Sequence, residues 1–120
     1  SKEDVYFSLN RNYFSVILHN ILDNAIKNTF NGTIEVKLQK LGNNLILKIK
    51  DTGAGMSMET LERYRKVFDN SDNEKINVSG SGLGLHIVSE TAKLMNAKIE
   101  INSEKGKGTE FYMLLPHKIK

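Results

Sequence analysis

The segment RNYFSVILHNILDNAIKNT, residues 11–29, decides the fold, because its apolar side chains recur at the spacing of one helix face. These apolar positions are Phe14, Ile17, Leu18, Ile21, Leu22 and Ala25. Asn10 stands just before the segment and suits an N-cap, since its side-chain oxygen can accept a hydrogen bond from an amide of the first turn. We therefore expect a helix from Asn10 to about Thr29, with one face packed on other elements.

A β-hairpin is expected directly after this helix. Residues 33–41 alternate between apolar and polar side chains, which is typical of a half-buried strand. The apolar positions of that strand are Ile34, Val36 and Leu38. Residues 42–44, Gly-Asn-Asn, tolerate positive φ, and residues 45–50 then resume the alternation.

The remaining elements complete a two-layer architecture. We expect a short strand at Val5–Leu9, helices at Ser57–Phe68 (capped by Ser57) and Leu83–Met95, a long polar loop at Asp69–Ser81, and strands at Lys98–Ser103 and Thr109–Leu115. The only proline, Pro116, ends the last strand. This order predicts an α+β fold, a two-layer α/β sandwich whose mixed, mainly antiparallel sheet is covered on one face by three helices.

Composition narrows the class of protein. The chain has 120 residues, 39% of them hydrophobic, which is enough for one domain spanning 1–120 with a single core. Its formal charge of +3 is small for a nucleic-acid binder, and basic and acidic residues alternate along it. No apolar run approaches the roughly 20 residues that span a bilayer. Because the sequence has no cysteine and starts at Ser1 rather than Met, we expect an excised fragment with no disulfide or thiolate chemistry.

A polar stripe follows the first helix. Asn20, Asn24 and Lys27 are spaced i, i+4, i+7 and share one face. Asparagine is unfavourable inside a helix, at about 0.5 kcal/mol each relative to alanine, so a compensating role is expected. The stripe is either a solvated face or a site where an amide oxygen ligates a hard cation such as Mg²⁺ and the lysine meets a phosphate.

Two glycine-rich stretches follow predicted elements. Residues 51–55, DTGAG, come directly after a strand, where Asp51 could accept hydrogen bonds from an exocyclic amine and would prefer adenine to guanine. Residues 80–85, GSGLGL, open the last helix, and free amides at a helix start suit a polyphosphate. Each stretch alone could equally be a structural turn. The three histidines have no metal-ligand spacing.

These stretches together resemble the motifs of the catalytic, ATP-binding domain of sensor histidine kinases. HNILDNAIK (19–27) is similar to the N box, DTGAGM (51–56) to the G1 box and GSGLGL (80–85) to the G2 box. GKGTEF (106–111) is similar to the last glycine motif of that family. The resemblance extends from about Asn10 to Pro116.

The resemblance implies the Bergerat ATP-binding fold, a mixed sheet of about five strands under three helices, with ATP and Mg²⁺ as ligands. It implies that Asn24 ligates Mg²⁺ and that Asn20 and Lys27 face the phosphates as catalytic residues. An ATP lid is implied at about 69–82.

The same resemblance implies a base pocket and a phosphate turn. Asp51 would bind the adenine amine, Gly53 and Gly55 would shape the pocket, and Thr109 would lie near Asp51 and the base. The lid hinge and the phosphate-contacting turn would consist of Gly80, Gly82, Leu83 and Gly84.

Position 20 distinguishes a kinase from an ATPase. Related ATPases of this fold, among them type II topoisomerases, the Hsp90 chaperone and mismatch-repair proteins, carry a glutamate there that activates water. An amide cannot accept a proton at neutral pH, so Asn20 favours phosphoryl transfer to another nucleophile. The implied partners are a dimerisation domain that carries the phosphoacceptor histidine and, downstream, a response regulator. The implied location of this fragment is the cytoplasm, in a parent protein that could be membrane-anchored.

Two departures from the family motifs keep alternatives open. Asn28 stands where the family usually has an aromatic residue in the nucleotide pocket, and the F box is faint, with residues 64–68 as its only candidate. The alternatives are a serine kinase of the anti-sigma-factor type, which shares the fold, and a degenerate nucleotide-binding scaffold.

Overall fold

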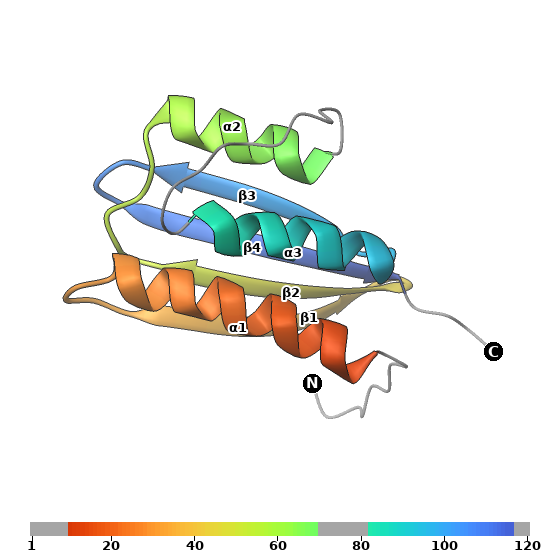
Figure 1. The fold of residues 1–120 in the computed structure, drawn as a ribbon. Helices are drawn as coiled ribbons and strands as arrows, with labels where there is room; N and C mark the ends of the chain where they lie inside the picture. The colour runs from red at the N-terminus through yellow and green to blue at the C-terminus, as the bar shows by residue number, and fades with distance from the viewer. Residues whose placement is uncertain (1–9, 70–81, 117–120) are drawn as a thin grey trace.

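The computed structural model describes residues 10–69 and 82–116. It contains the helices α1 (Arg11–Asn28), α2 (Met58–Asp69) and α3 (Gly82–Leu94), and the strands β1 (Ile34–Leu41), β2 (Asn44–Asp51), β3 (Lys98–Glu104) and β4 (Gly108–Pro116). The strands form one sheet in the order β1-β2-β4-β3, and every pairing is antiparallel. Figure 1 shows the three helices on one face of this sheet, which confirms the predicted two-layer α+β class.

The helix ends follow from short polar side chains. Asn10 Oδ1 accepts a hydrogen bond from the Tyr13 amide over 3.1 Å, and Ser57 Oγ accepts one from the Thr60 amide over 3.2 Å. Asn96, with φ of 56°, adopts the left-handed conformation just after α3. The sequence prediction of these three helices is therefore confirmed, within about a residue at each end.

The core lies between the helices and the central strands. Alternate residues of β2, β3 and β4 point toward the helices and are nearly inaccessible to solvent. From the helices, Ile17 and Ile21 of α1, Leu61 of α2, and Leu85 and Val88 of α3 complete this core. The apolar periodicity of residues 11–29 thus predicted the buried face of α1 correctly.

The prediction that β1 is half-buried is wrong. Val36 and Leu38 point to the helix side of the sheet, yet they are 53% and 59% exposed. The reason is that β1 is the outer strand, while α1 packs mainly against α3 and β2 and leaves the helix-side face of β1 open. Alternation indicated which side chains share a face, but not whether a helix covers that face.

Two predicted segments lie outside the described residues: the short strand Val5–Leu9 and nearly all of the polar loop Asp69–Ser81. Within the described residues the sheet has four strands and no parallel pair, so the fifth strand and the mixed character implied by the resemblance are not observed there. No helix in the described part of the chain is long and apolar enough to cross a membrane.

Candidate functional site

The site begins where β2 ends. Asp51, the last residue of β2, is opposite Thr109 in β4 and is 2% exposed. Its Oδ1 accepts hydrogen bonds from the amides of Gly53 over 2.9 Å and of Thr109 over 3.3 Å. Both of these bonds go to the same oxygen. The carboxylate is therefore held in one orientation by backbone donors, and its second oxygen accepts no hydrogen bond from the described residues.

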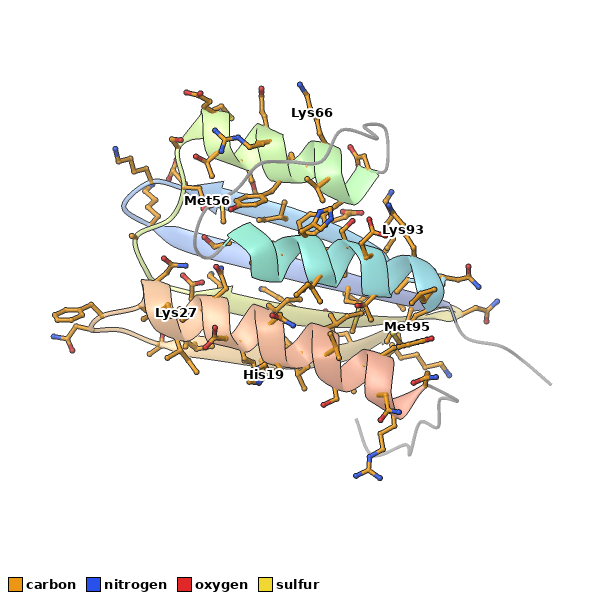
Figure 2. All side chains as sticks on the ribbon, in the orientation of Figure 1. His19, Lys27, Met56, Lys66, Lys93 and Met95 are labelled. Atoms are coloured by element: carbon orange, nitrogen blue, oxygen red, sulfur yellow. The ribbon has the colours of Figure 1, made fainter. Side chains whose placement is uncertain are left out.

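The segment after Asp51 is fixed at both ends by backbone contacts. The Ala54 amide donates to the carbonyl of Asn28 at the end of α1 over 3.0 Å, and the Gly106 amide donates to the Ala54 carbonyl over 2.7 Å. The Met56 amide donates to Ser103 Oγ of β3 over 2.9 Å. This segment therefore connects the end of α1 with the β3–β4 turn (Figure 2, where Met56 is labelled).

Two glycines allow this path. A Cβ on Gly53 would collide with the Asn28 carbonyl oxygen, and a Cβ on Gly55 would collide with the Glu104 carbonyl oxygen. Gly55 also has φ of 71°, in the left-handed region that favours glycine. The tight turns that residues 51–55 suggested therefore have a steric cause.

A cavity of about 390 Å³ opens between the end of α1 and the start of α2. Its lining residues are Asn24, Asn28, Ala54, Gly55, Met56, Ser57, Thr60, Tyr64, Lys105 and Thr109. Asn24 is 6% exposed, and within the described residues its buried Nδ2 has no hydrogen-bond partner. An unpartnered buried amide costs about 1–3 kcal/mol, which makes Asn24 a candidate ligand-binding group.

A second hollow, of about 810 Å³, adjoins the first and is lined by Asp51. The two hollows share Met56, Ser57, Lys105 and Thr109. Asp51 and Asn24 therefore do not line the same hollow, but Thr109 borders both. The structure thus brings Asn24, Asp51, Gly55 and Thr109 to one region, at the α1–α2 end of the central strands.

Asn20 and Lys27 line neither of these hollows. Asn20 Nδ2 donates to the Val16 carbonyl of its own helix over 2.7 Å. Its Oδ1 is 3.1 Å from where a Cβ on Gly84 would lie, so α3 packs closely on this residue. Lys27 Nζ forms an ion pair with Asp23 at 3.0 Å, with both side chains about half exposed; Figure 2 shows Lys27 near the C-terminal end of α1. The stripe of the first helix is therefore divided between a buried Asn24 and a solvated Lys27.

The glycine-rich stretch at 80–85 is described only in part. Gly82 is the first residue of α3 and Leu83 follows it in the helix, while Gly80 lies outside the described residues. A helix start supplies amides that have no acceptor within the helix. Gly84 is the member of this stretch that the structure brings against another predicted site residue, Asn20.

The arrangement fits a magnesium nucleotide. Mg²⁺ in nucleotide sites usually takes one or two protein oxygens together with phosphate oxygens and water. Asn24 lines the cavity and supplies one such oxygen, Oδ1, whereas its unmet Nδ2 is a hydrogen-bond donor that suits a phosphate oxygen rather than the metal. Within the described residues no three acidic, histidine or cysteine side chains are grouped to hold a metal without a phosphate.

Sequence reasoning missed the contribution of α2. Thr60 and Tyr64, spaced i, i+4, present one face of α2 to the cavity. That spacing was a usable signal, but Tyr64 was considered only as part of a faint F box. Burial raises the pKa of the Tyr64 hydroxyl, opposed by the nearby charge of Arg63.

Comparison with known proteins places this fold and site in a class. Residues 10–119 match the model of a family described as histidine kinase-, DNA gyrase B-, and HSP90-like ATPases, and the chain belongs to this family.

The individual relatives indicate a narrower class of protein within this family. The chain is 38% identical over 114 residues to the sensor histidine kinase YvrG of Bacillus subtilis, a match covering 94% of this chain and 20% of YvrG. It resembles the crystal structure of full-length ShkA in complex with AMPPNP, with a TM-score of 0.72, 27% identity, and coverage of 90% of this chain and 22% of ShkA. The fold also matches the catalytic domain of histidine kinase ThkA, with a TM-score of 0.77, 22% identity, and coverage of 100% of this chain and 77% of that one. The chain thus spans about a fifth of YvrG and of ShkA.

Proposed function

We propose that this chain binds MgATP and donates the γ-phosphoryl group to a histidine on the dimerisation domain of a two-component sensor kinase. Residues 1–120 would form the catalytic and ATP-binding domain, with residues 69–82 as the ATP lid. Membership of the family and the histidine kinase relatives support ATP as the ligand. A response regulator would receive the phosphoryl group downstream.

The base would be read at Asp51. Because Oδ1 is held by two backbone amides, Oδ2 can accept a hydrogen from the exocyclic amine of adenine. Guanine has an oxygen at that position and would meet the carboxylate acceptor to acceptor. Thr109, held beside Asp51 by its amide, would contact the same base, while Gly53 and Gly55 keep the pocket wall close.

The phosphates would lie toward Asn24. The amide of Asn24 would turn its oxygen to Mg²⁺, and the amides at the start of α3, around Gly82 to Gly84, would donate hydrogen bonds to phosphate oxygens. Lys27 would leave its exposed ion pair with Asp23, which is worth only about 0.3 kcal/mol, for the γ-phosphate. When bound, Mg²⁺ supplies neutralisation of the charge that develops on the phosphoryl oxygens.

One observation carries the choice of kinase over ATPase. Among the described residues that line the cavity beside Asn24, none bears a carboxylate or an imidazole. Asn20, one helical turn before Asn24, is an amide tied to the Val16 carbonyl. These side chains offer no general base to activate water, so the γ-phosphoryl group is kept for an external nucleophile.

The test has two stages. First, calorimetric titration of the chain with ATP, with and without Mg²⁺, should show binding that Mg²⁺ strengthens; no binding under either condition would favour the scaffold alternative. Second, MgATP labelled on the γ-phosphate, incubated with the chain and the dimerisation domain of the same polypeptide, should yield an acid-labile phosphohistidine. An acid-stable phosphoserine on a partner protein would instead favour the serine-kinase alternative.

The setting of the domain is part of the proposal. Because ATP is the phosphoryl donor, the domain would work in the cytoplasm. The chain covers 20% of YvrG and 22% of ShkA, so in a polypeptide of similar length a membrane anchor would lie outside this domain. Phosphoryl transfer requires the partner histidine to reach the γ-phosphate in line. Neither a nucleic acid nor a membrane surface is a partner in this proposal.

A further inference from the structure

The two walls of the Asn24 cavity differ in chemistry. The α1 wall presents the amides of Asn24 and Asn28, and the α2 wall presents the Thr60 hydroxyl and the Tyr64 ring. Among the described residues that line this cavity, Tyr64 is the only aromatic one. Within this part of the chain, a planar base in the cavity therefore meets a π surface from α2 alone.

The Asn28 side chain offers a base in this cavity little surface for stacking. Its side chain is exposed, and Nδ2 donates to the Asn24 carbonyl over 2.8 Å, which ties the amide to its own helix. An amide in this position offers no aromatic face and little apolar area. The α1 wall thus provides polar groups for phosphate or metal rather than a stacking surface.

Tyr64 is held rigidly. Only 7% of the residue is exposed, and it belongs to the core cluster with Leu61 and Leu85. A ring already fixed by packing loses little freedom when a ligand binds against it. Because burial raises its pKa, the Tyr64 hydroxyl stays neutral near pH 7 and introduces no negative charge beside a triphosphate.

We infer that Tyr64 is a base-binding residue on α2: its ring contacts the adenine at Thr109, where the Asn24 cavity adjoins the hollow lined by Asp51. The inference rests on the proposed binding of ATP and adds to it a residue that distinguishes a nucleotide from a bare polyphosphate. An aromatic ring can contact any base through its π face. This contact would add binding energy to the hydrogen bond that Asp51 would accept, while Asp51 would select adenine.

The test separates the base from the phosphates. Affinities of the 120-residue chain for MgATP and for magnesium tripolyphosphate, which has no base, are measured by calorimetry in the wild type, Tyr64→Phe and Tyr64→Leu. Tyr64→Phe should bind ATP within about threefold of the wild type, and Tyr64→Leu about tenfold more weakly, which is about 1.4 kcal/mol. Tripolyphosphate affinity should stay within about twofold in all three proteins.

A matched control removes another aromatic residue of the same helix. Phe68 packs edge-to-face on Phe111, with 6.3 Å between ring centroids, and does not line the Asn24 cavity. Phe68→Leu should lower thermal stability as Tyr64→Leu does, but leave ATP affinity unchanged.

Three results would overturn the inference. Tyr64→Leu could bind ATP as tightly as the wild type, it could lose ATP and tripolyphosphate affinity alike, or Phe68→Leu could lose ATP affinity to the same extent. In each case wild-type binding of MgATP would leave the proposed function standing. A wild-type chain that fails to bind MgATP would overturn the proposed function, and the inference with it.

Discussion

Asp51 and Thr109 face each other across the β2–β4 pair, and the Thr109 amide donates a hydrogen bond to Asp51 Oδ1 over 3.3 Å. The buried carboxylate is thereby part of the backbone hydrogen bonding of the sheet as well as a candidate ligand group. Ser103 supports the same corner, since its Oγ lies 2.8 Å from Thr109 Oγ1 and accepts from the Met56 amide. Substitutions at Asp51 must therefore be judged for stability and for binding separately.

Asp51→Asn should separate these two roles. The asparagine oxygen can still accept from the amides of Gly53 and Thr109, while its Nδ2 would meet the adenine amine donor to donor. We expect ATP affinity to fall at least about tenfold, GTP affinity not to fall, and the melting temperature to change little. Calorimetry with both nucleotides checks this expectation, and an ATP affinity within twofold of the wild type would refute the role of Asp51 in reading the base.

Asp51→Ala provides the contrast. It should also remove ATP binding, and circular dichroism should show the fold intact. Because the Gly53 and Thr109 amides lose their acceptor, the free energy of unfolding should drop by about 1–3 kcal/mol. Urea denaturation of the two variants side by side measures this difference. Equal stability would contradict the claim that Asp51 stabilises the fold as the acceptor of these two amides.

Asn24→Leu should leave stability unchanged or raise it. The leucine has nearly the shape of asparagine and removes a buried Nδ2 that has no partner in the described residues. The same change removes the proposed metal ligand, so Mg²⁺ should no longer strengthen ATP binding. Thermal melting and titration with and without Mg²⁺ check the two effects. A loss of several kcal/mol of stability with unchanged Mg²⁺ dependence would assign Asn24 a purely structural role.

Asn20→Glu should raise the rate of ATP hydrolysis. We expect the wild-type chain to hydrolyse ATP far more slowly than about 1 per second, a rate common among enzymes. A glutamate at this position supplies a general base, an effect worth about 100-fold or more when well placed. Asn20→Gln is the matched control, with the same length and no basicity, and should remain as slow as the wild type. Equal rates in Glu and Gln variants would show that the missing base does not limit hydrolysis.

Gly55→Ala and Gly106→Ala should differ in cost. Both glycines have positive φ, 71° and 84°, so each alanine costs about 1–2 kcal/mol of backbone strain. A Cβ on Gly55 would also collide with the Glu104 carbonyl, whereas nothing lies within 4 Å of a Cβ on Gly106. Chemical denaturation should therefore show a larger loss for Gly55→Ala, together with weaker ATP binding. Equal losses in the two variants would show that the close approach of the Glu104 carbonyl is not the reason why residue 55 is a glycine.

The sequence predicted the local elements well because their signals are local. Helical spacing and the Asn10 and Ser57 caps each depend on a few neighbouring residues. Exposure of β1 was not predictable in this way, since alternation in Val36 and Leu38 is the same whether or not a helix covers the strand. Only the placement of α1 against α3 and β2 decides it.

The candidate site was predictable as a set of residue types but not as a geometry. The polar stripe pointed to Asn24, the glycine-rich stretch at 51–55 to Asp51 and the family resemblance to Thr109, and the structure brings these residues to adjoining hollows. It did not show that Lys27 pairs with Asp23, since two side chains at i, i+4 can also point to a ligand. Tyr64 was not identified as a cavity residue, because the sequence of α2 does not show which cavity this face of the helix lines.

Stability should decline above pH 10 more steeply in the wild type than in a Tyr64→Phe/Tyr112→Phe double variant. Burial raises the pKa of Tyr64 from its ordinary 10.0, against the lowering effect of Arg63. The hydrogen bond from the Tyr112 hydroxyl to Glu110, 2.7 Å long, is the main reason that the pKa of Tyr112 is raised. A raised folded-state pKa means that the folded protein disfavours the phenolate, so this contribution to stability is complete below pH 10 and is lost as pH rises through the raised values. Urea midpoints of the two proteins should therefore diverge only above pH 10, and a constant offset between pH 8 and pH 11 would show that ionisation of these hydroxyls is not the cause.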